Sequence, residues 1–341
     1  MRSPIPNVTI STKSNYTNLG YQLLGADCNG DGFADLLIGS PFYGQDAEPQ
    51  VSQRGLLSLF YSSSQRALNR SLAVEQADWS MVGEAAGAWL GYAMLVVQRS
   101  ASPQSLLLVG SPRFQSKSEV ALGKLYALDL QCIAAGKGTS SCLVFSIVGA
   151  SKFDQVGSAF SFGSFEQVSD MLALSLPNHD KTGFGLGQQE GIVALLDMST
   201  LSGNVSYAQL KPKSVLNGDE NWARFGWAVQ LVDLAGNGSF TLWAGQPRQK
   251  LSALEGEAGA VYQWNSYVVI VIVLVLVRST HISASMTVTS RSVARPRSRA
   301  PRRASKTRMP RAASARCSAL LTLMATERRM PSWSRRASAR S

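Results

Sequence analysis

The residues best suited to chemistry in this sequence form a short loop rich in side-chain oxygens. Within residues 27–35, oxygen-bearing side chains stand at loop positions 1, 3, 5 and 9, and a glycine stands at position 6. Ca²⁺ takes roughly six to eight oxygen ligands, and such a loop can direct alternate side chains inward. The sequence therefore predicts a Ca²⁺ site formed by the side chains of Asp27, Asn29, Asp31 and Asp35 and the main-chain carbonyl of Phe33.

The segments on either side indicate the kind of loop. An EF-hand lies between two helices and carries a glutamate at position 12, whereas Ile38 stands there and strand-like runs flank the loop. The alternative interpretation is a turn that its own Asx side chains hold together without metal. If Ca²⁺ binds, we expect it to stiffen the connection between two strands rather than to take part in catalysis.

A second loop, at residues 233–241, has lost part of this pattern. Asp233 and Asn237 keep positions 1 and 5, but Ala235 and Thr241 stand at positions 3 and 9. Because too few charged oxygens remain for a hard cation, we expect weak metal binding or none.

Residues for bond-breaking chemistry are sparse. The chain has two histidines, His179 and His281, and neither a Gly-x-Ser-x-Gly elbow nor a phosphate-binding glycine loop. We expect His179 to be a solvated loop residue, because it follows Pro177 and Asn178 and precedes Asp180. The chain as written is not expected to be catalytic.

The elements that position the loop repeat along the chain. An apolar residue followed by glycine recurs every 66 to 71 residues, and a strand that ends in proline follows about twenty residues later. A third marker, a glycine that precedes alternating apolar residues, recurs at intervals of 68 residues. The markers of the first and third kinds are Gly20, Gly91, Gly157 and Gly226, and Gly55, Gly123, Gly191 and Gly259, respectively.

Each repeat holds several apolar runs of strand length, including one before each apolar–glycine pair. Four strands per unit are typical of a propeller blade, which buries its faces only by stacking on other blades. We therefore predict an all-β fold, a partial β-propeller of about four blades, each a four-stranded antiparallel sheet. The predicted blades are residues 15–75, 76–140, 141–208 and 209–264, after an N-terminal extension at residues 1–14.

The repeat resembles the FG-GAP repeat of integrin α-subunit propellers and of the C-terminal propeller of glycosylphosphatidylinositol-specific phospholipase D. The resemblance covers roughly residues 15–264. It rests on residues 89–92, which lead to the run at 107–112, and on residues 224–227. It implies a calcium-binding propeller that supports a separate, metal-dependent catalytic domain acting on membrane-anchored substrates. The alternative is an adhesion propeller that binds a protein ligand on one face.

The net charge of +11 belongs to the end of the chain. From residue 265 onward there are 16 Lys and Arg and one acid, Glu327, so the repeats are slightly acidic. This distribution argues against a nucleic-acid partner for the folded part.

Cysteines and glycosylation motifs bear on the cellular compartment. Cys132 and Cys142 can close a disulfide across a short loop if the protein is secreted, or remain two thiols. An extracellular or secretory location is expected, without a membrane anchor, and the absence of an apolar core at the start suggests the interior of a larger protein. Five Asn-x-Ser/Thr motifs suit such a glycoprotein: Asn7, Asn15, Asn69, Asn204 and Asn237.

The end of the chain follows a different pattern. Residues 267–277 are an apolar run too short to span a bilayer, and an Arg-, Ser- and Ala-rich stretch follows. Shifting the reading frame from residue 321 onward converts the sequence into another Asp- and Gly-rich calcium loop followed by a strand. We interpret residues 265–280 as a retained intron or frameshift and residues 281–341 as out of frame. The alternative is a genuine, disordered basic tail.

Overall fold

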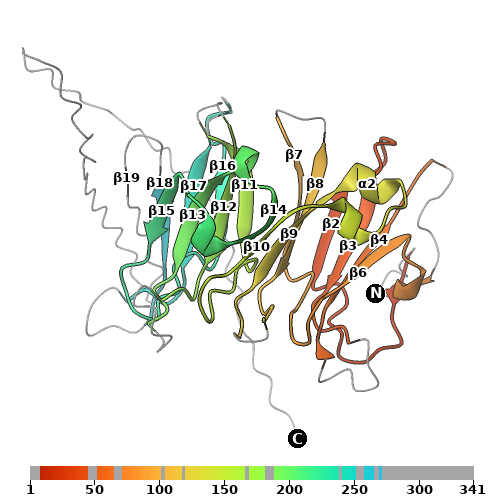
Figure 1. Ribbon diagram of the computed structural model, residues 1–341, viewed down its shortest axis with the longest axis horizontal. Helices are drawn as coiled ribbons and strands as arrows, with labels where there is room; N and C mark the ends of the chain where they lie inside the picture. Colours follow the sequence, from red (N-terminus) through yellow and green to blue (C-terminus); the bar gives the residue numbers. More distant parts are fainter. Residues whose placement is uncertain are drawn as a thin grey trace, which may run out of the picture. The chain divides into compact units, whose positions relative to one another are not determined.

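The fold is known from a computed structural model. It describes residues 8–44, 52–64, 71–100, 104–116, 120–165, 169–180, 188–236, 238, 240–250, 257–264 and 269–270. These residues form four main β-sheets, which follow one another along the chain as the blades of a propeller (Figure 1). The prediction of an all-β propeller of about four blades is confirmed.

The first two blades are built from neighbouring strands in antiparallel order. The first sheet has the order β2-β3-β4-β6, and β7-β8-β9-β10 forms the core of the second. The strand bounds are β2 (Gln22–Ala26), β3 (Asp35–Ser40), β4 (Leu56–Phe60), β6 (Trp79–Val82), β7 (Met94–Gln98), β8 (Ser105–Ser111), β9 (Lys124–Asp129) and β10 (Leu143–Val148).

The third and fourth blades repeat this plan. Their sheets have the orders β11-β12-β13-β15 and β16-β17-β18-β19. The strand bounds are β11 (Phe160–Phe165), β12 (Ser169–Leu176), β13 (Ile192–Asp197), β15 (Ser214–Asn217), β16 (Val229–Val232), β17 (Thr241–Gln246), β18 (Ala260–Trp264) and β19 (Val269–Ile270).

Two additions depart from four identical four-stranded sheets. Strand β14 (Gly203–Ser206) belongs to the third repeat but pairs in parallel with β10, which gives the second blade a fifth strand. Near the start of the chain, β1 (Ile10–Ser11) pairs in parallel with β5 (Leu72–Ala73). Both additions place a short strand from one repeat, or from the extension, against a neighbouring blade.

The helices are short. They are η1 (Val74–Gln76), α2 (Leu130–Ala134), α3 (Thr139–Cys142), η2 (Met198–Thr200) and η3 (Tyr207–Gln209). Of the described helices, none has the length and hydropathy needed to cross a bilayer.

The sheets run across the predicted blade limits. Strand β6 pairs with β4 and so completes the first blade, although residues 79–82 lie beyond the predicted limit at residue 75. Strand β10 completes the second blade in the same way, and β19 extends the fourth sheet past residue 264. The predicted tail, residues 281–341, lies outside the described residues, as does most of the 265–280 segment.

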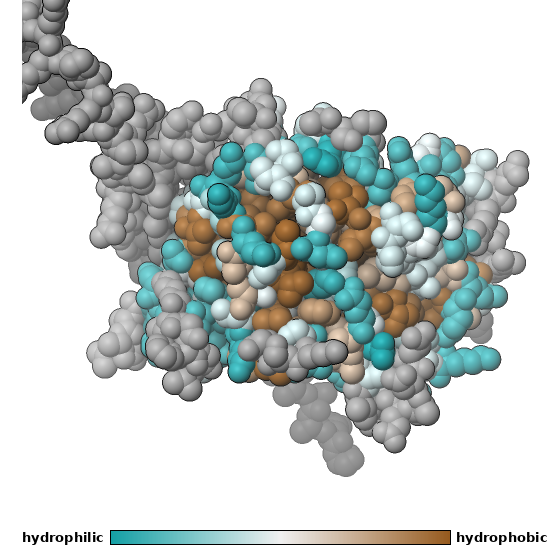
Figure 2. Space-filling view, viewed as in Figure 1, coloured by the Kyte–Doolittle hydropathy of each residue, from teal (hydrophilic) through white to brown (hydrophobic). Residues whose placement is uncertain are grey.

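The hydrophobic core lies between successive blades. One cluster joins the first blade to the second, another the second to the third, and a third the third to the fourth. Among the described residues no cluster joins the first blade to the fourth. In Figure 1 the first blade lies on the right, and the strands of the third and fourth blades overlap on the left. Figure 2 shows apolar side chains across the middle of this face, interleaved with hydrophilic ones.

The glycines of the 68-residue period hold neighbouring blades together. Gly55 forms a parallel bridge with Leu90 and Gly123 forms one with Val156, so each glycine meets the apolar–glycine pair of the next repeat. Gly191 likewise packs against the backbone of Phe225. A Cβ atom at any of these glycines would overlap that backbone, and all three have positive φ, which disfavours other residues. The repeat period is therefore set by close backbone contact between blades.

Exchange of one such glycine tests this explanation. Gly123→Ala adds a methyl group against Val156, whereas Gly136→Ala adds one at a similar φ with no atom within 4 Å. Positive φ alone costs an alanine about 1–2 kcal/mol. Overpacking against the backbone adds about 1–3 kcal/mol more at Gly123. Urea denaturation followed by circular dichroism measures both variants, and equal losses of unfolding free energy would contradict the contact.

The structure joins Cys132 and Cys142 in a disulfide that links α2 to α3. The free Cys28 is buried in the core between the first and second blades. Of the two alternatives for Cys132 and Cys142, the structure shows the disulfide.

The disulfide should stabilise the chain by limiting its unfolded conformations. For a loop with a sequence separation of 10, the expected loss in the Cys132→Ser/Cys142→Ser variant is about 2–3 kcal/mol. Urea denaturation with and without dithiothreitol provides the control. The reductant should lower the stability of the wild type to that of the variant and leave the variant unchanged; an unchanged wild type would count against the bond.

Candidate functional site

The predicted calcium loop connects β2 to β3 at the end of the first strand of the first blade. Its exposed side chains include Asp27, Asn29 and Asp31, and the Phe33 side chain is 43% exposed. Asp35, the first residue of β3, is buried at 2% exposure. The structure therefore brings the predicted residues together in one loop with an open side and a buried base.

Asp27 organises the turn. Its Oδ1 accepts hydrogen bonds from the Gly30 N–H at 2.7 Å and the Asp31 N–H at 3.2 Å, and its Oδ2 accepts one from Gly32 at 2.9 Å. These donors, Gly32 first, hold the pKa of Asp27 below its ordinary value, against a smaller opposing effect of burial. Asp27 is thus kept ionised, as a cation ligand must be.

The other side chains continue the turn. The Asp31 Oδ1 accepts the Phe33 N–H at 2.9 Å, and the Asn29 Oδ1 accepts the Asp31 N–H at 3.0 Å. The Asp35 carboxylate accepts the N–H groups of Cys28 and Ser62, both at 2.8 Å. Asp35 therefore ties the loop to Ser62, which follows β4, and these bonds fix the position of the Asp35 oxygens.

Asp35 is also where negative charge accumulates. Burial raises the pKa of Asp35 above its ordinary value, and the charges of Asp31 and Asp27 add to this effect, while the N–H donors of Ser62 and Cys28 oppose it. A cation among these three carboxylates would offset their repulsion and the cost of burying Asp35. The charge balance of the loop therefore suits a divalent cation.

The carboxylates alone do not make a metal cluster. In the part of the chain that the structure describes, no three His, Cys, Asp or Glu side chains gather closely enough to hold an ion. The predicted set also needs the Asn29 amide and the Phe33 carbonyl, which are oxygen ligands that calcium accepts. The calcium site stays a prediction, and the hydrogen bonds of Asp27 also support the turn itself.

The second loop shares one hydrogen bond of the first. The Asp233 Oδ2 accepts the Gly238 N–H at 2.8 Å, which mimics one bond of the first loop. Asn237 lies outside the described residues. Weak metal binding or none remains the expectation for this loop.

His179 lies in a loop, as predicted, but its side chain is paired rather than solvated. The ring Nδ1 of His179 lies 2.7 Å from the Asp154 Oδ1, the His179 side chain is 20% exposed, and Asp154 is fully buried. The other oxygen of Asp154 accepts the N–H groups of Ala150 and Ser151. His179 is therefore a partner of a buried carboxylate, and the pair joins the loop after β12 to the connection between the second and third blades.

Comparisons with known proteins agree with this geometry. The FG-GAP repeat model matches residues 19–55, which contain the calcium loop, both strands beside it and Gly55. The chain is an FG-GAP repeat β-propeller.

Curated relatives extend the similarity beyond one repeat. The phosphatidylinositol-glycan-specific phospholipase D of Mus musculus is 31% identical over 290 residues, covering 77% of this chain and 32% of the relative. The Homo sapiens protein of that name is 30% identical over 282 residues, and the Dictyostelium discoideum protein 31% over 258 residues. This FG-GAP chain spans about a third of the length of the relatives from mouse and man.

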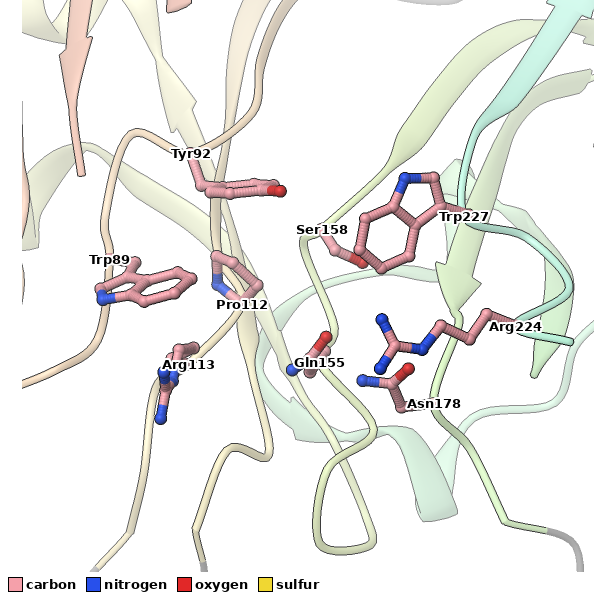
Figure 3. Close-up of a pocket in the computed structure, with 9 residues that line it drawn as sticks. All are labelled: Trp89, Tyr92, Pro112, Arg113, Gln155, Ser158, Asn178, Arg224 and Trp227. Atoms are coloured by element: carbon pink, nitrogen blue, oxygen red, sulfur yellow. The ribbon is translucent and has the colours of Figure 1, made fainter. Parts of the chain in front are cut away.

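The structure also gathers residues that sequence analysis did not assign to a site. A cavity of about 170 Å³ is lined from three blades by Trp89, Tyr92, Arg113, Asn178, Arg224 and Trp227, among others (Figure 3). The signal for several of them was available, because Trp89 and Arg224 directly precede apolar–glycine pairs and Tyr92 and Trp227 directly follow them. Their residue types change from repeat to repeat, so the period alone did not reveal a shared site.

Calcium should stabilise the chain through the first loop. In excess Ca²⁺ the melting temperature should rise above that in EDTA, since a ligand of the native state adds about 2.7 kcal/mol at a hundred times its dissociation constant. Asp31→Ala should abolish the increment, and the matched Asp233→Ala variant should keep it. Differential scanning fluorimetry measures all three, and a wild type that melts alike in Ca²⁺ and EDTA would rule out the site.

Proposed function

We propose that this chain is the non-catalytic, calcium-binding propeller region of a protein similar to glycosylphosphatidylinositol-specific phospholipase D. In this proposal it supports a catalytic domain that lies outside these repeats. The observation that carries the proposal is the 31% identity to the mouse enzyme across 77% of the chain. The similarity spans far more than one repeat, so it concerns the order of the blades and not a single motif.

The way in which the blades pack supports this proposed role. Their apolar side chains are used to pack blade against blade, and the loop at residues 27–35 is arranged to bind a cation or to stiffen a turn. Calcium in such a loop would fix one end of the first blade. We propose that this stiffening, rather than chemistry at the ion, is the contribution of the metal.

An extracellular or secretory location belongs to the same proposal. The disulfide between Cys132 and Cys142 suits an oxidising compartment. Asn15 and Asn204, which begin Asn-x-Ser/Thr motifs, are exposed. The partners in this proposal are the catalytic domain and, through it, membrane-anchored substrates.

A domain exchange tests the proposal. The matching region of the mouse enzyme is replaced by this chain, and release of a phosphatidylinositol-glycan-anchored protein from membranes is measured. The hybrid should release the protein, whereas this chain alone and a hybrid carrying an unrelated β-propeller should not. Release by this chain alone would contradict the non-catalytic role, and an inactive but folded and secreted hybrid would contradict the supporting role.

A further inference from the structure

The cavity of Figure 3 lies at the end of the blades opposite to the calcium loop. The calcium loop follows the first strand of its blade, whereas Trp89 and Tyr92 precede the first strand of the second blade and Arg224 and Trp227 precede that of the fourth. Arg113 and Asn178 follow the second strands of the second and third blades. The cavity is therefore a feature of the assembled blades and is distinct from the calcium loop.

Aromatic faces form part of its wall. The rings of Trp89 and Tyr92 are stacked with centroids 6.2 Å apart. Two rings of the first blade pack against them: the Phe42 centroid lies 4.8 Å from that of Trp89, and the Tyr21 centroid lies 5.0 Å from that of Tyr92. Trp227 contributes a further ring and is 44% exposed. Flat apolar faces held in place by neighbouring rings suit a ring-shaped ligand with apolar C–H faces.

Two arginines give the cavity a positive charge. The guanidinium of Arg113 lies 4.6 Å from the Trp89 ring centroid, and that of Arg224 lies 5.4 Å from the Trp227 ring centroid. Neither arginine forms a salt bridge to a carboxylate within the described residues. Burial lowers the pKa of Arg224, and the neighbouring Arg248 adds to this effect, partly offset by Glu257. An anion in the cavity would offset both the cost of burying the Arg224 charge and its repulsion by Arg248.

Two uncharged polar atoms of the lining have no hydrogen-bond partner in the part of the chain that the structure describes. The Oδ1 of Asn178, a residue that is 5% exposed, and the buried Oγ of Ser158 have no hydrogen-bond partner among the described residues. Figure 3 shows the Asn178 side chain next to the guanidinium of Arg224 on one side of the cavity. Buried polar atoms are nearly always hydrogen-bonded, so these two are available to bond the hydroxyl groups of a ligand.

From this combination we propose that the cavity binds a phosphorylated sugar or cyclic polyol. Arg224 would hold the phosphate, and Arg113, on the other side of the cavity, would add positive charge. Trp227 would stack on the ring, and Asn178 and Ser158 would bond its hydroxyls. A phosphate monoester carries a charge of about −1.5 to −2 at neutral pH. It therefore matches the two positive charges of the cavity better than a ligand with a single carboxylate does. The cavity is smaller than the roughly 300–1,000 Å³ of sites for drug-sized ligands, so it suits one ring.

Isothermal titration calorimetry on the full chain tests this assignment. The probes are glucose 6-phosphate, mannose 6-phosphate and myo-inositol 1-phosphate, compared with glucose, mannose, myo-inositol, glucuronate and inorganic phosphate. At least one phosphorylated ring should bind more tightly than its neutral ring, glucuronate or inorganic phosphate. If none of the three binds at millimolar concentration, or if inorganic phosphate binds as tightly as all of them, the assignment is overturned.

Variants connect any binding to the cavity. Arg224→Gln should weaken binding of the phosphorylated ring by about tenfold or more, as expected for the loss of a charge-assisted hydrogen bond, and Arg113→Gln should weaken it less. Trp227→Ala should weaken binding of the phosphorylated ring but leave binding of inorganic phosphate unchanged. Binding that all three variants retain would place the ligand elsewhere and overturn the proposal.

Matched controls separate the cavity from general effects. Lys213→Gln removes an exposed cation that pairs with Asp197 at the other end of the third sheet, and Trp222→Ala removes a similarly exposed tryptophan outside the cavity. Both should bind the phosphorylated ring as the wild type does. Asp31→Ala should also bind it normally, so failure of the calcium loop and failure of this proposal give different results. Circular dichroism melts confirm that each variant is folded.

Discussion

The rest of the structure depends on the contact between a glycine of one blade and the backbone of the next. Gly55, Gly123 and Gly191 each meet the apolar residue of the following apolar–glycine pair, and no side chain fits between them. Because this contact joins two backbones, it fixes the distance and the register of adjacent sheets more tightly than side-chain packing can. The apolar clusters between the blades then fill a space whose shape is already set.

The same contact positions the residues on either side of it. Where Val156 or Phe225 is held against the preceding blade, the residue before it adopts a positive φ, as Gln155 and Arg224 do. The side chains that flank each pair are thereby directed toward the blade ends, where three connections meet in the cavity of Figure 3. Gly259 has Pro247 as its nearest neighbour rather than another blade. The fourth blade therefore presents an unused copy of the contact within the described residues.

The sequence predicts the parts of this molecule that are encoded locally or periodically. The glycine period yields the blades, and nine contiguous residues yield the oxygen-rich loop for which calcium is predicted, since a tight loop brings its own side chains together. Contacts between residues that share no local pattern were not predicted from the sequence. His179 and Asp154 are 25 residues apart in different loops, and β14 pairs with a strand of the preceding blade. Such contacts depend on the relative placement of blades, which no short segment specifies.

This difference separates the two candidate sites in physical terms. The calcium loop draws all its predicted ligands from one turn, so its geometry needs only β2 and β3 to be paired. The cavity takes Tyr92, Asn178 and Trp227 from three blades, so it exists only while both intervening glycine contacts hold. A ligand in the cavity would bridge those blades and stabilise their arrangement, whereas calcium would stabilise one hairpin. Binding at one end of the propeller would thus stabilise a pair of strands, and binding at the other end would stabilise the assembly of blades.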